Sequence, residues 1–169
     1  LDTANADGTI VAPFCSLADS PLLARVFNSY DRETTDFYRW TQVYELRELS
    51  ALVREKSGVD IGELTALEPL AKGASGRIFR LRVVGTKNSF IVGKELEIRR
   101  ILSPSHLRSS AFDAEFTSDG RVILRGLGWG HGVGLCQIGA AVMADRGYGY
   151  RAILEHYYPG TQISESLSK

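Results

Sequence analysis

The residues best placed to do chemistry lie in a glycine-rich stretch, residues 126–140, which reads GLGWGHGVGLCQIGA. Glycine occupies every second position from 126 to 134. If the stretch is extended, one face is bare backbone and the other carries the side chains between the glycines. A bare face lets another backbone, or a flat ligand such as a sugar ring, approach closely. Glycine also permits positive φ anywhere along the stretch, so a wholly extended conformation is not assured.

A helix of small residues is expected directly after this stretch, over 135–146. Backbone N–H groups in the first turn of a helix lack intrahelical partners, and they can bind an oxyanion or a ligand hydroxyl. His131 lies just before this turn and Gln137 lies within it. We therefore predict that His131 and Gln137 flank one small ligand site, lined by the backbone of Gly130 and Gly132. Trp129 shares a face with His131 and is expected to stack on a ring of the ligand.

Other interpretations of the same stretch remain open. The small residues at 139–144 favour close helix docking, so the glycines could serve packing alone and His131 could be a buried, hydrogen-bonded imidazole. A nucleotide site lacks the G-x-x-x-x-G-K-[ST] pattern and the acidic residue expected about 20 positions on. A metal site built from His131 and Cys136 lacks further ligands nearby. We therefore expect no metal and no cofactor.

The elements that must position this stretch follow from periodicity and turn signals. Strands are expected over 37–44, 61–70 (ending near Pro69), 77–84 and 89–92, with a hairpin joining 111–116 to 121–125 and an edge strand at 162–164. Helices are expected over 21–27, 46–56, 94–102, 135–146 and 150–158. In the strand 77–84, alternation places Phe79, Leu81 and Val83 on the buried face. The fold class is α+β, with mixed, mainly antiparallel strands in the middle, short helices around them, and a glycine-rich strand-to-helix junction near the C-terminus.

Composition limits the classes of protein that fit. The 169 residues are 44% hydrophobic and 24% charged, as in globular domains, and their formal net charge is zero, which argues against a nucleic-acid partner. Two cysteines cannot build a disulfide-dense scaffold, but they leave one disulfide or two free thiols open. Residues 126–144 carry no charge, yet they hold too many glycines and too few large apolar residues for a membrane span. The opening residues, LDTANADGTIVAPF, indicate a start inside a longer protein.

Residues 126–163 closely resemble the C-terminal signature of the SpoIID/LytB family, which comprises sporulation stage II protein D and the amidase enhancers. That signature is, loosely, G-x-G-W-G-H-G-V-G-(M/L)-x-Q-x-G-A, then a helix, then an aromatic I-L-x-H-Y-Y-x-G. Upstream, the Trp40 strand, the turn 75–77 (SGR), the helix at 97–99 (EIR) and the segment 107–112 (LRSSAF) also resemble the family. The resemblance covers roughly residues 13–165. It implies that residues 1–169 form a single SpoIID/LytB-like domain portion that lacks the N-terminal part of the family domain.

The resemblance implies a cell-wall protein outside the cytoplasmic membrane, in the periplasm or cell envelope, whose partners are peptidoglycan glycan strands and, as a candidate, a cell-wall amidase or other cell-wall enzyme. Family members are similar to lytic transglycosylases, which cleave between MurNAc and GlcNAc and leave a 1,6-anhydro ring. Their catalytic Glu lies in a segment like E-A-L-K-A-Q-A-V-A-A-R-T-Y, which this sequence lacks, and the zinc-binding Cys and His residues of some members have no counterpart. No catalytic residue is therefore assigned. Two functions stay open: a transglycosylase whose acid lies elsewhere in the protein, and a non-catalytic module that binds peptidoglycan or enhances an amidase.

Overall fold

The computed structural model describes residues 3–4, 10–11, 13–17, 21–22 and 38–164. The chain forms two compact units, one over Tyr38–Gly132 and the other from Leu1–Phe37 together with Val133–Lys169. Each unit is described by itself below. The expectation of one domain portion over 1–169 stays a prediction.

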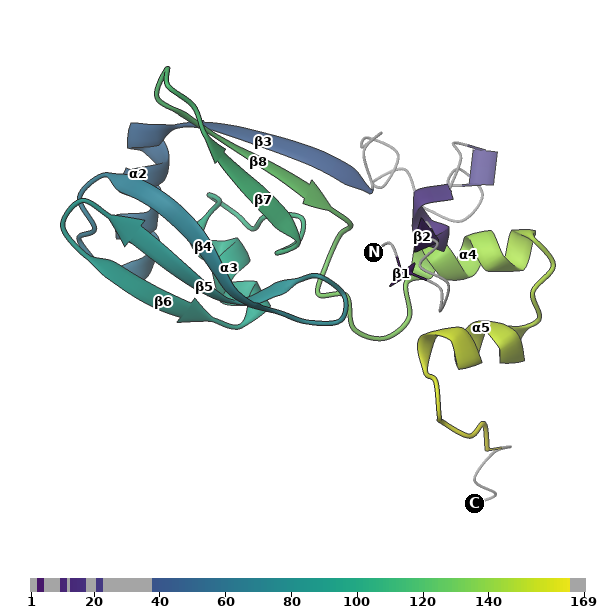
Figure 1. Cartoon of the computed structure of the whole chain (residues 1–169). Coiled ribbons are helices and arrows are strands. Elements are labelled where there is room, and N and C mark those ends of the chain that lie inside the picture. The colour runs from purple at the N-terminus through teal and green to yellow at the C-terminus, as the bar shows by residue number, and fades with distance from the viewer. Residues whose placement is uncertain (1–2, 5–9, 12, 18–20, 23–37, 165–169) are drawn as a thin grey trace. The chain divides into compact units, whose positions relative to one another are not determined.

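The unit Tyr38–Gly132 contains two antiparallel sheets of three strands (Figure 1). The first has the order β3-β8-β7, with β3 at Arg39–Glu45, β8 at Arg121–Leu127 and β7 at Phe112–Phe116. The second has the order β4-β5-β6, with β4 at Leu64–Lys72, β5 at Ile78–Gly85 and β6 at Ser89–Gly93. Two helices complete this unit, α2 at Leu46–Ser57 and α3 at Glu95–Ile101. The predicted α+β class with antiparallel strands is confirmed.

Helix α2 shows how the apolar pattern positions an element. Leu49 and Val53 lie one turn apart on the predicted apolar face, and both are fully buried. The helix ends where Gly58 adopts φ of 73° and donates its N–H to the carbonyl of Arg54 at 2.9 Å. This cap turns the chain toward β4.

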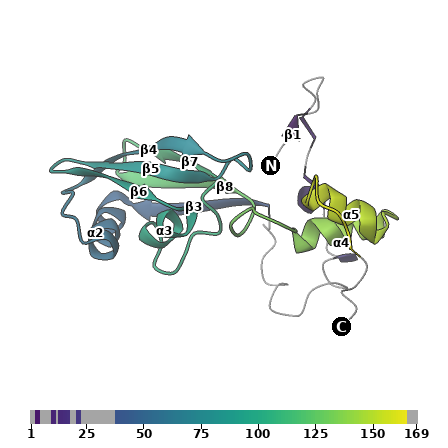
Figure 2. The same ribbon diagram turned by 90° about the horizontal axis from the view of Figure 1, so that it is seen from below.

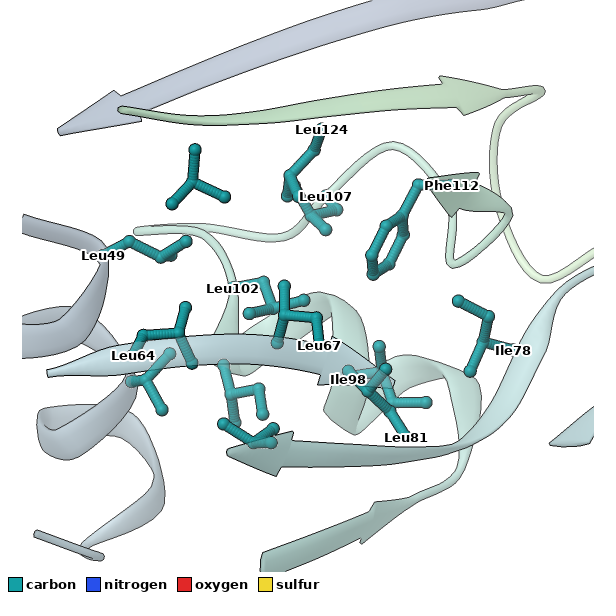
Figure 3. Packing of buried hydrophobic residues seen from close by; sticks show 14 of the residues in the cluster. Leu49, Leu64, Leu67, Ile78, Leu81, Ile98, Leu102, Leu107, Phe112 and Leu124 are labelled. Atoms are coloured by element: carbon teal, nitrogen blue, oxygen red, sulfur yellow. The ribbon is translucent and has the colours of Figure 1, made fainter. Parts of the chain in front are cut away.

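The hydrophobic core lies between the two sheets (Figure 3). Both sheets and both helices contribute side chains to it, among them Leu49, Leu64, Leu67, Ile78, Leu81, Ile98, Leu102, Leu107, Phe112 and Leu124. At about 25 cal/mol per Å² of buried apolar area, such a cluster is the main stabilising contribution to this unit. Strand β8 carries Val122 and Leu124 into it, so the glycine-rich stretch begins at a rigid strand end.

Three predicted details of the strands are wrong. In β5, Ile78 is fully buried whereas Phe79 is 45% exposed, because irregular pairing around Ala71 shifts the alternation at this end of the strand. Strand β4 does not end near Pro69 but continues to Lys72, with Pro69 beside that irregularity. Residues 162–164 form no strand.

The described residues of the other unit include the short pair β1 (Thr3–Ala4) and β2 (Ile10–Val11), the 3₁₀ turn η1 (Phe14–Leu17), and the helices α4 at Gln137–Asp145 and α5 at Tyr150–Tyr157. The junction between β8 and α4 is the predicted glycine-rich strand-to-helix connection. Of the helix expected over 21–27, all but the first two residues lies outside the described residues. No helix within the described ranges is long and apolar enough to cross a membrane.

Candidate functional site

The glycine-rich stretch begins inside β8, where Gly126 pairs with Trp40 on one side and Phe112 on the other. A Cβ atom at Gly126 would come within 2.0 Å of Cζ2 of the Trp40 indole. The same indole donates from Nε1 to the carbonyl of Gly128 at 3.1 Å. Gly126 is therefore glycine because the buried Trp40 ring occupies the place of its side chain.

Beyond β8 the stretch leaves the extended conformation. Gly128, Gly130, Gly132 and Gly134 have φ of 68°, 74°, 69° and 77°, in the left-handed region. A side chain at such a position is strained, so every second residue must be glycine for a backbone reason. Of the two conformations that the sequence left open, the extended one ends at Leu127, and positive φ at alternate glycines follows it.

The buried side chain of Arg77 fills the space beside two of these glycines, Gly128 and Gly132. Its Nε donates to the carbonyl of Gly130 at 2.8 Å and its Nη2 donates to the carbonyl of Trp129 at 3.1 Å. A Cβ atom at Gly132 would lie 2.1 Å from Nη1 of Arg77, and one at Gly128 would lie 3.2 Å from Nη2. The backbone of residues 128–132 thus curves around the guanidinium. At Gly128 and Gly132 the loop is packed against the protein's own side chain, whereas the place of a Cβ atom at Gly130 is open.

A second segment, residues 108–111, runs beside the stretch and fixes it through the backbone. The N–H of Gly130 donates to the carbonyl of Arg108 at 2.7 Å, and the N–H of Leu127 donates to that of Ala111 at 2.8 Å. The Ser109 hydroxyl donates to the carbonyl of Leu127 at 2.7 Å. These bonds, with those from Arg77, leave the loop 128–132 little conformational freedom.

Trp129 and His131 project from this fixed loop. The guanidinium of Arg108 lies 5.8 Å from the centroid of the Trp129 ring, a cation–π contact, and the Trp129 side chain is nevertheless 50% exposed. His131 is exposed, so the alternative of a buried imidazole is wrong. An aromatic ring and an imidazole two positions apart thus face solvent from one rigid loop.

Four of the five predicted site residues belong to this loop: Trp129, Gly130, His131 and Gly132. Gly130 has no atom near the position of a Cβ, whereas that position at Gly132 is taken by Arg77. Gln137, the fifth, is exposed at the start of α4, in the other compact unit. The pairing of His131 with Gln137 around one site therefore stays a prediction.

Sequence reasoning assigned no role to Arg77 or Arg108. Both lie in segments that carried the family resemblance, 75–77 and 107–112, and that resemblance was the available signal. Nothing in the local pattern indicates that the arginine directly before β5 turns inward to a loop more than fifty residues away. An arginine that is buried needs a specific partner, and here the partners are backbone carbonyls.

Metal binding finds little support in the structure. Among the residues that are described, no group of three or more His, Cys, Asp and Glu side chains could hold a metal ion. His131 and Cys136 belong to different compact units. The expected absence of a metal and of a cofactor remains a prediction.

The family model described as "Domain of unknown function (DUF8618)" matches residues 1–134, and the chain belongs to that family. The chain is also similar to "Stage II sporulation protein D" of Bacillus amyloliquefaciens, with 31% identity over 88% of this chain and 39% of that protein. The protein of the same name from Bacillus subtilis (strain 168) is 30% identical over 86% of this chain and 39% of its own length.

A third relative is an amidase enhancer, the other kind of protein in the SpoIID/LytB family. The "Amidase enhancer" of Bacillus subtilis (strain 168) is 46% identical to this chain over 41 residues, which is 24% of this chain and 6% of that protein. The predicted resemblance to the SpoIID/LytB family is thereby confirmed. The chain spans about two fifths of the length of the sporulation proteins that it matches.

Proposed function

We propose that this chain is a glycan-binding portion of a cell-wall-related sporulation protein, and that the loop 128–132 contacts peptidoglycan glycan strands through Trp129 and His131. The observation that carries the proposal is the half-exposed Trp129 ring beside an exposed imidazole on a loop fixed by Arg77 and Arg108. The names of the relatives, a stage II sporulation protein and an amidase enhancer, support a cell-wall context.

The chemistry of the loop suits a sugar. The C–H groups on one face of a pyranose ring pack against an indole, and an imidazole can both donate to and accept from hydroxyl groups. Because the hydrogen bonds to Gly130 and Trp129 already fix the loop, binding would cost little conformational entropy. A rigid aromatic platform with one adaptable polar neighbour is thus available for a repeating glycan.

For the complete protein we propose lytic transglycosylase activity, with cleavage between MurNAc and GlcNAc and a 1,6-anhydro product. Such a reaction needs a carboxylic acid that protonates the glycosidic oxygen and then accepts the proton of the C6 hydroxyl. The family's Glu segment is absent from this sequence, so the acid would come from the rest of a protein that is longer than this chain. Location outside the cytoplasmic membrane follows from this substrate.

The alternative is a non-catalytic module that binds peptidoglycan or enhances a cell-wall amidase. The relative named "Amidase enhancer" and the missing Glu segment favour it. Incubation of the complete protein, and separately of this chain, with purified peptidoglycan distinguishes the two, with 1,6-anhydromuropeptides detected by mass spectrometry. Product from the complete protein alone supports the transglycosylase. Sedimentation with peptidoglycan without product from either supports the module.

Replacement of Trp129 by alanine is expected to weaken sedimentation of the chain with peptidoglycan about ten-fold, since the sugar loses its aromatic platform. His131→Ala is expected to weaken it several-fold, because one hydrogen-bonding group is lost. Both side chains are exposed, so the midpoint of thermal unfolding should change by no more than about 2 °C.

Matched controls are available in the same unit. Phe79→Ala removes another exposed aromatic ring, and His106→Ala removes another exposed imidazole. Neither should change the affinity. Gln137→Ala tests whether α4 joins the site: a loss comparable to that of His131→Ala supports the predicted pairing. Unchanged sedimentation of both Trp129→Ala and His131→Ala would contradict glycan binding by this loop.

A further inference from the structure

The two cysteines come from opposite ends of the sequence but meet in the same compact unit. Cys15 lies in η1, which packs against α4, and Cys136 is the residue that caps the start of α4. The dark purple turn of η1 lies beside α4 in both views (Figures 1 and 2). The two side chains are close enough to interact, and this interaction with Cys136 is the main cause that raises the pKa of Cys15.

The surroundings of the two sulfurs are well defined. Cys136 Sγ accepts a hydrogen bond from the backbone N–H of Gly139 at 3.4 Å. The hydroxyl of Tyr157, on α5, lies 2.1 Å from the position that a Cβ atom of Gly139 would take. Burial, followed by the nearby Cys136 and Cys15, raises the pKa of Tyr157, while the hydrogen bond to Cys136 and burial raise the pKa of Cys15. The side chains of Cys15, Cys136 and Tyr157 therefore form one partly buried cluster, contributed by η1, the start of α4 and α5.

The residue next to Cys15 holds the turn in this place. The ring of Phe14 packs edge-on against the rings of Tyr148 and His156, with centroids 5.7 Å and 5.3 Å away. The guanidinium of Arg146 lies 6.0 Å from the centroid of the same ring. Phe14 is thus anchored on the segment from α4 to α5, and the turn that carries Cys15 packs against α4.

We propose that Cys15 and Cys136 form an intrachain disulfide that fastens the N-terminal segment of the chain to the start of α4. The proposal does not depend on glycan binding. Cys15 lies in the turn that packs against α4 and Cys136 caps that helix, so the two side chains can approach one another to form a disulfide. Among the described residues no third side chain completes a metal site around them, so the pair is better suited to oxidation than to metal coordination.

The reaction proceeds by thiol–disulfide exchange with a low-molecular-weight disulfide such as glutathione disulfide. Cys136, whose sulfur accepts a hydrogen bond from the Gly139 N–H, gives its proton to solvent and attacks one sulfur of the oxidant as the thiolate. A mixed disulfide forms and one thiolate leaves. Cys15 then gives its proton to solvent and attacks Cys136 Sγ, which releases the second thiolate. Two cysteine thiols become one disulfide, and the oxidant takes up two electrons as two thiols.

The consequence of the bond follows from its position in the sequence. It closes a loop that contains all of Tyr38–Gly132, and the stabilisation that a disulfide confers increases with the length of the loop that it closes. For a chain of this size we expect the oxidised protein to unfold roughly 5–10 °C above the reduced protein. The cross-link would hold η1 on α4 even where the surrounding contacts open.

The test is to equilibrate the purified protein with glutathione disulfide and to measure its mass under non-reducing conditions. The expected result is a monomer about 2 Da lighter, which yields a proteolytic peptide linking Cys15 to Cys136 and loses that link on treatment with dithiothreitol. Two thiols that still react with Ellman's reagent, or only glutathione adducts and intermolecular dimers, would overturn the proposal.

Serine substitutions test whether the disulfide accounts for the higher unfolding temperature of the oxidised protein. Cys15→Ser and Cys136→Ser should each abolish the 2 Da loss, and the double variant should unfold at one temperature with or without dithiothreitol. If a single variant fails to fold, the mass measurement on the unchanged protein still decides the outcome. An equal effect of dithiothreitol on the double variant would show that the stabilisation does not come from this bond.

Discussion

Gly126→Ala is expected to lower the free energy of unfolding by roughly 3 kcal/mol, at the upper end of the range for overpacking a buried site. The added methyl group would meet Cζ2 and Cε2 of Trp40 at 2.0 and 2.1 Å. The indole cannot move away freely, because it is buried in the core and its Nε1 is bonded to the carbonyl of Gly128. A shift of the ring would therefore cost packing and a hydrogen bond together.

Chemical denaturation measures the free energy of unfolding of Gly126→Ala, and Gly93→Ala is the control. Gly93 ends β6 in an exposed position, and a Cβ atom added there would have no other atom within 4 Å, so its replacement should change the free energy of unfolding by less than about 1 kcal/mol. Equal stability of the two variants would show that the indole of Trp40 is not confined as described. Near-ultraviolet circular dichroism of Trp40 should change only in Gly126→Ala.

The elements outside the glycine-rich stretch could be predicted because each one carries its own signal. Leu49 and Val53 recur at helical spacing before Ser57 and Gly58, and α2 has that face and that end. The hairpin of β7 and β8 has its turn around Asp119 and Gly120, where the residues SDG interrupt two apolar runs. These features depend on neighbours within a few positions, which the sequence displays directly.

The glycine-rich stretch could be predicted only in part, because its conformation depends on residues far away in the sequence. Alternating glycines fit an extended ribbon as well as a series of left-handed turns, and the choice is made by Arg77, Trp40 and the segment 108–111. Periodicity contains no information about such partners. The sequence proposed Trp129 and His131 as ligand contacts but left a buried His131 open, and the side chain of Arg77 beside Gly128 and Gly132 was not predicted.

Arg77→Met tests whether this filling shapes the site, and we expect it to lower the free energy of unfolding by roughly 2–4 kcal/mol. Methionine retains much of the volume but leaves the carbonyls of Trp129 and Gly130 without the guanidinium donors. The free energy of unfolding of Arg77→Lys should lie between those of the parent chain and Arg77→Met, because one ammonium group lacks the planar fork that reaches both carbonyls. Arg82→Ala, an exposed arginine of β5 paired with Glu68 at 3.2 Å, is the control and should cost at most about 1 kcal/mol.

The same variant separates a structural from a positioning role of Arg77 in glycan binding. If the guanidinium holds Trp129 and His131 in the arrangement that binds, folded Arg77→Met should sediment with peptidoglycan about ten-fold more weakly than the parent chain, although neither exposed side chain has changed. Hydrogen exchange should accelerate at Gly130 and Gly132 and stay unchanged in α2. A folded variant with reduced stability but full affinity would mean that Arg77 supports the fold alone. In that case the loop would owe its binding geometry to the hydrogen bonds that it makes with Arg108 and Ser109, because these bonds hold the other side of residues 127–130.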